Sequence, residues 1–309
     1  MKKVLLSLSV VFILCSFQVP ILMILPYLPY AAVDMTLCKT SNNGQVQSGE
    51  IFKNGTSIGN IITINRTSGT IKAKYFAQKE NGMTVHDRYT QWRNSKNVVL
   101  ASSGAYASGF DVSATPIGIT VDNGNLVNTN YDTKMDGLVI VEQSGGVRIS
   151  NIEDGNLKIR TNNVFEAVDV KNSFQRTKFL KWCQSEYATV FQTHLLIYDN
   201  KIKVGVSNSS QTKDIRRLLV LAKDTKGELF HIILYTNKWQ STLYDIADYT
   251  LKLLNTKGYQ VLSAINLDTG GVDVLSTTTS LSDCSGFAIV GTSNKTRNSV
   301  SNLLTYYAE

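Results

Sequence analysis

The sequence predicts a mixed α/β (α+β) fold, strand-rich and with few helices, and three observations lead to it. Short apolar runs rich in Val, Ile, Tyr and Thr recur along the chain, separated by Asn, Gly, Asp and Ser, which is typical of strands joined by turns. Residues 242–258 have instead the apolar spacing of an amphipathic helix. The 277 residues from Val33 to Glu309 suit one large domain or two small ones, and we expect a single domain.

The N-terminal segment has the layout of a secretory leader. Two lysines precede an apolar run from Val4 to Val19, which continues past three prolines to Ala32, and the first acidic residue is Asp34. We therefore expect residues 1–32 to direct export, so that the protein is secreted, periplasmic or anchored on the extracytoplasmic side of a membrane. Because no clear small-x-small site stands near Ala32, a cleaved signal peptide and a retained membrane anchor both remain open.

Charge and cysteine content exclude several classes of protein. The formal net charge is +7, but Lys and Arg are scattered rather than gathered in one stripe, so we expect no nucleic-acid partner. The cysteines that follow the leader, Cys38, Cys183 and Cys284, are far apart and odd in number. One disulfide is compatible with this spacing, whereas a disulfide scaffold is not.

The histidines give no sign of a metal site. His86, His194 and His231 have no ligand-like spacing to each other or to a cysteine. We therefore predict no metal, and no motif in the chain calls for a cofactor.

Strands dominate the first half of the chain. The clearest are Ile61–Ile64, Thr70–Phe76, Val98–Ala101, Ile117–Val121 and Gly137–Val141. Asn123 and Gly124 favour a tight hairpin turn, because both residues tolerate positive φ. We assign residues 33–95 to N-terminal strands that belong to the same globular unit as residues 96–309.

The second half predicts a hairpin, a helix and a further strand. Leu218–Ala222 and Leu229–Tyr235 flank an Asp-Thr-Lys-Gly turn, which indicates two buried strands. Thr242 and the Asp three residues later form a capping box, apolar residues then follow on one helical face, and Gly258 can end the helix. Val261–Leu267 is expected to be the next strand.

The best candidate site follows this last strand. Asn266, Leu267, Asp268, Thr269, Gly270 and Gly271 stand at its carboxyl end, where α/β sheets commonly place ligand-binding turns. A carboxylate that leaves a strand into a Gly-Gly turn is held rigidly, and the bare amides beside it let a ligand approach closely. Such a turn suits a sugar or a phosphate. The alternative is a Gly-rich hairpin in which Asp268 only caps the turn.

Six segments of the chain, in the same order, resemble those of the phosphodiester glycosidase family. AINLDTGG from Ala264 is similar to the family's Asn-Leu-Asp-Gly-Gly-Gly hallmark. The other five are VVLASSGAYA from Val98, TPIGITVDNGNLV from Thr115, FQTHLLIYDNKI from Phe191, DIRRLLVLAKDTKGELFHIIL from Asp214 and RNSVSNLL from Arg297. The resemblance covers Lys96 to Leu304 and implies a single strand-rich domain of the phosphodiester glycosidase type. Bacterial chains with this resemblance are described as exopolysaccharide biosynthesis proteins.

The resemblance implies an extracytoplasmic hydrolase that removes a sugar from a phosphodiester or from a surface polysaccharide linkage, through an oxocarbenium-like transition state. Asp268 would be the carboxylate near the anomeric carbon, as nucleophile, as base for water or as acceptor for a sugar hydroxyl. Arg217 or Arg216 would hold the phosphate. His194 would donate to the substrate or shuttle a proton, unless it is a core residue. Catalysis is thus assigned to Asp268, Arg217 and His194, and substrate binding to Arg216, Gly270, Gly271, Ser103, Gly104, Tyr106, Gln192 and Asn302.

The chain also departs from the family's pattern. Ser103 stands where the family has Asn, Ala105 where it has the second Gly, and Thr269 where it has the first Gly of the hallmark. Val272-Asp273-Val274 replaces the Ser-Ser-Thr that normally follows Gly271. A divergent specificity and a lost activity are both consistent with these changes, so the second hypothesis is a catalytically inactive glycan-binding or scaffolding protein of the envelope.

Overall fold

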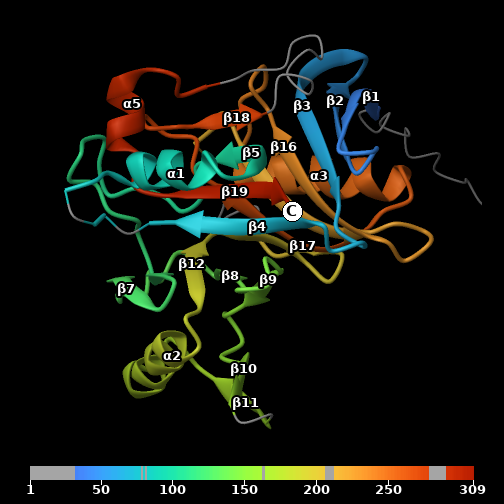
Figure 1. The fold of residues 1–309 in the computed structure, drawn as a ribbon. Coiled ribbons are helices and arrows are strands. Elements are labelled where there is room, and N and C mark those ends of the chain that lie inside the picture. The colour runs from blue at the N-terminus through green and yellow to red at the C-terminus, as the bar shows by residue number, and fades with distance from the viewer. Residues whose placement is uncertain (1–31, 78, 81, 162–163, 206–211, 278–289) are drawn as a thin grey trace, which may run out of the picture. The chain divides into compact units, whose positions relative to one another are not determined.

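Antiparallel sheets make up most of the structure, a computed structural model in which residues 32–77, 79–80, 82–161, 164–205, 212–277 and 290–309 are described (Figure 1). Every strand pairing within these ranges is antiparallel, and four helices accompany the sheets. The predicted strand-rich, mixed α/β fold with few helices is therefore confirmed. The expected leader lies outside the described residues, among which no helix is long and apolar enough to cross a membrane.

The largest sheet has eight strands in the order β1-β2-β3-β16-β15-β17-β13-β14. Their bounds are β1 Val33–Ser41, β2 Val46–Lys53, β3 Thr56–Asn65, β16 Leu229–Tyr235, β15 Arg217–Lys223, β17 Gln260–Leu267, β13 Leu195–Tyr198 and β14 Lys201–Ile202. Helix α3, Leu243–Thr256, covers one face, where Ile246 and Leu253 share a hydrophobic core with Leu218 and Val220 of β15. Full burial of a Leu or Ile side chain stabilises the fold by about 1.5–3 kcal/mol. The amphipathic helix and the buried strands predicted for this part of the chain are therefore present.

A second sheet packs on the other face of the first. Its order is β18-β5-β19-β4, with β18 Leu275–Thr277, β5 Asn97–Ser102, β19 Leu303–Ala308 and β4 Ile71–Phe76. Leu219 and Ile233 of the first sheet and Leu100 and Leu304 of the second belong to one buried core. Two short helices, α1 Val85–Arg93 and α5 Asn294–Ser299, accompany the second sheet (Figure 1). The two sheets therefore bring β5, β15 and β17 close together.

The remaining elements form a third packing unit around β12. A five-stranded sheet has the order β7-β6-β12-β8-β9, with β7 Asn125–Asn128, β6 Thr120–Asp122, β12 Thr189–Thr193, β8 Gly137–Val141 and β9 Val147–Asn151. The hairpin of β10 Leu157–Thr161 and β11 Val164–Val168 lies with helix α2, Ser173–Ser185, below this sheet in Figure 1. Phe179 and Cys183 of α2 are fully buried against Leu138 and Ile119.

The local turn and cap predictions agree with the structure. Asn123 and Gly124 have φ values of 50° and 80°, as a tight hairpin turn between β6 and β7 requires. Thr242 caps α3 in a complete capping box with Asp245. The strand expected at Ile117–Val121 begins only at Thr120, because Gly118 has a φ of 78° and breaks the extended conformation.

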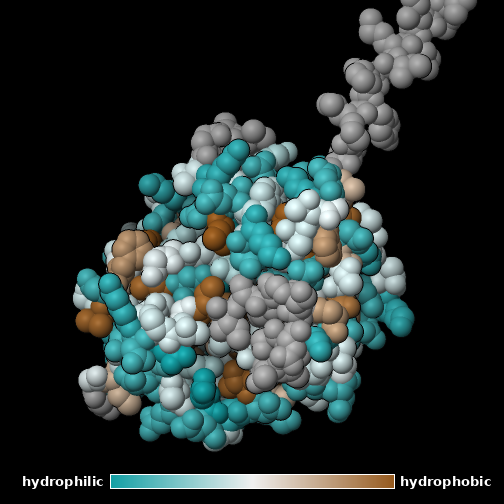
Figure 2. Space-filling view, turned by 90° about the horizontal axis from the view of Figure 1, so that it is seen from above, coloured by the Kyte–Doolittle hydropathy of each residue, from teal (hydrophilic) through white to brown (hydrophobic). Residues whose placement is uncertain are grey.

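The cysteines differ in their state, and one face of the surface is mostly polar. Cys183 is free and buried, whereas Cys38 is disulfide-bonded, and Cys284 lies outside the described residues. On the face shown in Figure 2, the hydrophobic residues drawn in colour form separate small patches among polar ones. The coloured part of that face therefore presents no broad apolar surface.

Candidate functional site

The predicted site residues lie where several strands begin or end. The Asp268 amide, just after β17, donates to the carbonyl of Gly104, which follows β5, at 2.9 Å. The Asn266 amide donates to the carbonyl of His194, between β12 and β13, at 3.0 Å. Arg217, at the start of β15, pairs in register with the last residue of β17. Asp268 follows the carboxyl end of β17, as predicted. Because the sheet is antiparallel, the site combines this strand end with strand starts.

Asp268 is a buried carboxyl group held by two backbone amides. Asp268 is 7% exposed. Its two carboxyl oxygens accept hydrogen bonds from the N–H groups of Gly270 at 2.9 Å and Ala107 at 3.2 Å. Burial raises the pKa of Asp268 above its ordinary value, although these two amides act in the opposite direction. The site therefore holds an oriented carboxyl group that takes up a proton more readily than an exposed aspartate.

Tyr106 and His194 lie beside each other near this carboxyl group. Their rings meet edge to face, with centroids 5.3 Å apart and an interplanar angle of 84°. The Tyr106 hydroxyl accepts a hydrogen bond from the Asn266 side-chain amide. Burial raises the pKa of Tyr106 to about 12 and lowers the pKa of His194 below its ordinary value. At neutral pH the tyrosine thus keeps its proton, and the imidazole is neutral.

Asn266 lies in the turn that the sequence analysis chose as the best candidate site, although it was given no role there. It is fully buried, and its side-chain oxygen is buried without a hydrogen-bond partner among the described residues. Because its amide nitrogen donates to Tyr106, the tyrosine hydroxyl is left with its own proton to donate elsewhere. Its place in the Asn-Leu-Asp segment was the available signal.

The two neighbouring arginines have different surroundings. Arg216 is 7% exposed, and its guanidinium donates to the carbonyls of Ser241 at 3.1 Å and Thr212 at 2.8 Å. No carboxylate in the described part of the chain lies within ion-pair distance of it. Its positive charge acts on both Tyr106 and His194. Arg216 therefore supplies a cation to the cluster that no carboxylate of the site neutralises.

Arg217 instead has an internal counter-ion. Its side chain is fully buried, and its two terminal nitrogens contact the two oxygens of Asp273 at 2.6 and 3.1 Å. The guanidinium carbon also lies 4.4 Å from the ring centroid of Tyr235. A direct contact between Arg217 and a substrate would require this ion pair to open.

Two other predicted residues, Gln192 and Ser103, have their hydrogen bonds occupied within the protein. The Gln192 side chain accepts from the Ile119 amide at 3.1 Å and donates to the Met135 carbonyl at 2.6 Å. The Ser103 hydroxyl accepts from the Val274 amide at 2.9 Å. These contacts place Gln192 and Ser103 in supporting positions around the site.

Asn302 fixes the turn that follows β5. Its side-chain oxygen accepts from the amides of Gly104 at 3.0 Å and Ala105 at 2.7 Å, and its nitrogen donates to the Ala105 carbonyl at 2.8 Å. A Cβ atom on Gly104 would come within 2.8 Å of that oxygen, so the close approach requires glycine. Asn302 and Gly104 therefore determine the path of the chain into Tyr106.

The Gly270-Gly271 turn lies under an aromatic ring. Gly270 and Gly271 are exposed, and a Cβ atom on Gly271 would come within 2.9 Å of the ring of Phe110. Phe110 is itself 67% exposed. The ring stands at the rim of the turn, and the sequence analysis did not name it.

A cavity of about 510 Å³ opens beside His194. Asp136 and Glu153 line it together with two lysines, Lys134 and Lys203. Burial, followed by the nearby negative charge of Glu153, raises the pKa of Asp136. These residues reach His194 because Gly137 pairs with Thr193 on one side and with Asn151 on the other, in register. Nothing in the local sequence predicts this juxtaposition.

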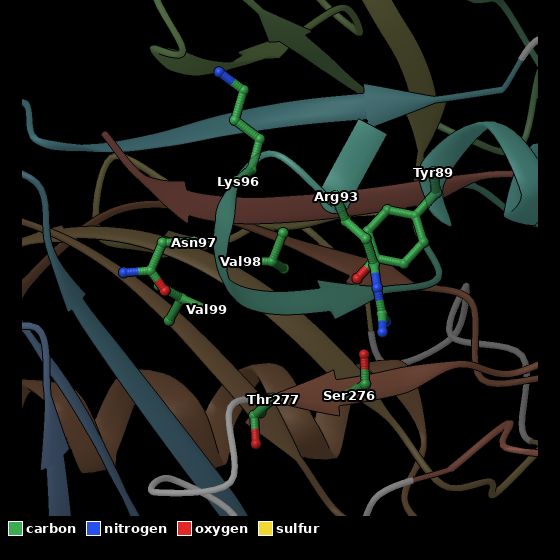
Figure 3. A pocket seen from close by; sticks show the side chains of 8 residues that line it. All are labelled: Tyr89, Arg93, Lys96, Asn97, Val98, Val99, Ser276 and Thr277. Atoms are coloured by element: carbon green, nitrogen blue, oxygen red, sulfur yellow. The ribbon is translucent and has the colours of Figure 1, made fainter. Parts of the chain in front are cut away.

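A different cavity, of about 340 Å³, lies at the opposite end of β5. Figure 3 shows its lining, which includes Tyr89 and Arg93 of α1 and Ser276 and Thr277 of β18. None of the predicted site residues lines it. Among the described residues no group of three or more His, Cys, Asp or Glu side chains is placed to hold a metal ion.

Comparison with known proteins gives distant structural similarities. No protein-family model and no curated protein matches the sequence. The zebrafish N-acetylglucosamine-1-phosphodiester α-N-acetylglucosaminidase catalytic domain, auto-inhibited by its pro-peptide, is 13% identical, with a TM-score of 0.46 over 92% of this chain and 85% of that one. A hypothetical protein from Synechocystis is 12% identical, with a TM-score of 0.47 over 90% of this chain and 68% of that one. A Burkholderia pseudomallei protein thought to be exported is 10% identical, with a TM-score of 0.46 over 85% and 74%. Function therefore has to be argued from the site itself.

Proposed function

We propose that the protein is an extracytoplasmic glycosidase that hydrolyses a sugar from a phosphodiester or from a surface polysaccharide linkage. The observation that carries the proposal is the buried Asp268 carboxyl group, oriented by the amides of Gly270 and Ala107 beside Tyr106, His194 and Arg216. A carboxylate, a proton donor and a cation in one cluster are the groups that departure of a sugar from a phosphate needs. Export rests on the leader at residues 1–32.

The proposed chemistry divides the work among these residues. Asp268 faces the anomeric carbon, where its negative charge stabilises the oxocarbenium-like transition state. The Tyr106 hydroxyl, which accepts from Asn266, donates its proton in a hydrogen bond to the substrate. A phosphomonoester leaves as a stable anion, so a cation that holds it matters more than a strong general acid, and Arg216 supplies that charge.

His194 connects the cluster to the cavity lined by Asp136 and Glu153. As a neutral imidazole it can take up the proton of an attacking water. In this proposal Arg217 holds Asp273, and Gln192, Ser103 and Asn302 hold the loops of the site. No cofactor and no metal takes part in the proposed reaction.

The test is hydrolysis of a panel of α-linked sugar phosphodiesters by the wild type and by Asp268→Asn. Asp248→Asn is the matched control, because Asp248 lies on α3, where it forms an i,i+4 ion pair with Lys252. Turnover by the wild type and by the control, with a loss of at least about 10²-fold in Asp268→Asn, would support the enzyme. Equal turnover in Asp268→Asn would refute the role of this carboxyl group.

The alternative is an envelope protein that binds glycans without turnover. The specific observation in its favour is the ion pair by which Asp273, part of the segment that replaces Ser-Ser-Thr, occupies the Arg217 guanidinium. Sugar binding without hydrolysis of any substrate in the panel would establish this alternative.

A further inference from the structure

A third cavity is lined by residues far along the chain from Asp268, which come from β8, β9, the β10–β11 hairpin and α2. Its volume is about 440 Å³, and it shares no residue with the candidate site. Glu142, Arg148, Arg160, Phe165, Trp182 and Glu186 provide the chemistry of its walls. The volume falls in the range typical of sites for small organic ligands.

Two aromatic residues line this cavity: Trp182, which is packed and hydrogen-bonded within the protein, and Phe165, which is exposed. Trp182 stacks on the fully buried Phe179, with centroids 5.8 Å apart and an interplanar angle of 20°, and its indole N–H donates to the Arg160 carbonyl at 2.9 Å. Since the indole N–H is already bonded within the protein, Trp182 would contact a ligand through its ring and not through its N–H. Phe165, on β11, also lines the cavity and is 66% exposed. An exposed phenylalanine in a strand has an energetic cost in water that a ligand would remove.

The polar groups around these rings are planar and of both charges. Arg160 pairs across the hairpin with Phe165, and its guanidinium carbon lies 5.9 Å from that ring centroid. Arg148 donates to the Lys158 carbonyl at 3.1 Å, while its Nε–H is buried without a partner among the described residues. Glu142 and Glu186 form no ion pair with any described residue. The cavity thus offers both donors and acceptors.

We propose that this cavity binds a neutral sugar unit of a polysaccharide. A sugar ring has a face of C–H groups, which can stack on Phe165 and Trp182, and a rim of hydroxyls that both donate and accept. The Arg148 guanidinium and the Glu142 carboxylate, which line the cavity, supply the complementary partners. Two guanidinium groups and two carboxylates balance in charge, which favours a neutral sugar over a polyanion. The site would hold a polymer independently of the Asp268 cluster.

The test is affinity electrophoresis of the protein in gels that contain a neutral β-glucan, a galactomannan or glycol chitin, with dextran sulfate as the anionic comparison. We expect at least one neutral polymer to retard the wild type, and Phe165→Ala to weaken that binding by about tenfold or more. Phe174→Ala is the matched control, because Phe174 is 81% exposed on α2 and does not line the cavity. Arg148→Met, which removes a guanidinium group from the lining of the cavity, is expected to weaken binding as well.

Asp268→Asn separates this proposal from the proposed hydrolysis, because it should be retarded as strongly as the wild type. Retardation by dextran sulfate alone, or no retardation by any neutral polymer, would overturn the proposal. So would equal binding by the wild type and Phe165→Ala, or an equal loss in Phe174→Ala. Circular dichroism of each variant shows whether a loss comes from unfolding, and Phe165, being exposed, can be truncated with little effect on the fold.

Discussion

Arg217 and Asp273 form a buried, two-point ion pair between the start of β15 and the turn that follows β17, with nitrogen–oxygen distances of 2.6 and 3.1 Å. Arg217 also donates to the Val274 carbonyl at 3.1 Å. The pair therefore ties the eight-stranded sheet to the chain segment that enters β18. Its position next to Asp268 means that it shapes the candidate site without exposing the guanidinium to it.

Removing one partner of this pair should be costly. Arg217→Met leaves Asp273 without its counter-ion in a largely buried position, and we expect a loss of about 3–5 kcal/mol in the free energy of unfolding. The double variant Arg217→Met/Asp273→Leu should recover much of that loss, because no buried charge remains. Urea unfolding of the two single variants and the double variant measures this. Losses that simply add would contradict the pairing.

The raised pKa of Asp268 predicts a stability that depends on pH. In the unfolded chain an aspartate titrates at about 3.9, whereas burial raises the pKa of Asp268 in the folded protein. The folded state binds the proton more tightly, so this group's contribution to stability is fully present below the unfolded pKa and is lost as pH rises through the folded pKa. The difference in melting temperature, Asp268→Asn minus wild type, should grow between pH 4 and pH 7. A difference that stays flat or shrinks would contradict the raised pKa.

Much of the fold could be predicted because its signals are local. The capping box at Thr242, the continuous apolar run of β15 and the Asn123-Gly124 turn each depend on a few neighbouring residues. The order of the strands could not be predicted, because β3 pairs with β16 across a long stretch of sequence. Such pairings depend on long-range packing, which a local pattern does not contain.

The candidate site shows the same division. The sequence identified Asp268 from its Gly-Gly turn, but it could not separate the surroundings of Arg216 and Arg217. Neighbouring residues of an extended chain point to opposite faces, and the local sequence does not show that Arg217 rather than Arg216 meets Asp273. Asp136 and Glu153 were missed because the long-range pairing of β8 with β12, together with the β8–β9 hairpin, brings them to His194.

Asn302 should be required for the turn that carries Tyr106. Asn302→Ala removes the acceptor of the Gly104 and Ala105 amides, which are buried, and leaving them unsatisfied should cost about 1–3 kcal/mol in the free energy of unfolding. Asn128→Ala is a suitable control, because Asn128 is only half-buried and its side chain bonds to the Pro116 carbonyl in a surface hairpin. Thermal unfolding of both variants measures the difference. An equal effect of the two substitutions would argue against a special role for Asn302.

His194 should give the activity its acidic limit if it acts as a neutral imidazole. Burial lowers the pKa of His194 below its ordinary value, so the neutral form persists to a lower pH than in an exposed histidine. We therefore expect the acidic limb of the kcat/KM profile of the wild type on a sugar phosphodiester to have its midpoint below the ordinary pKa of a histidine, about 6.5. His194→Gln should lose about 10²-fold in kcat/KM and lack this acidic limb. His86→Gln, a substitution of a half-buried histidine on α1, controls for a general effect of losing an imidazole. The same acidic limb in His194→Gln as in the wild type would assign the titration to another group, with the Asp268 carboxyl group as the first to test.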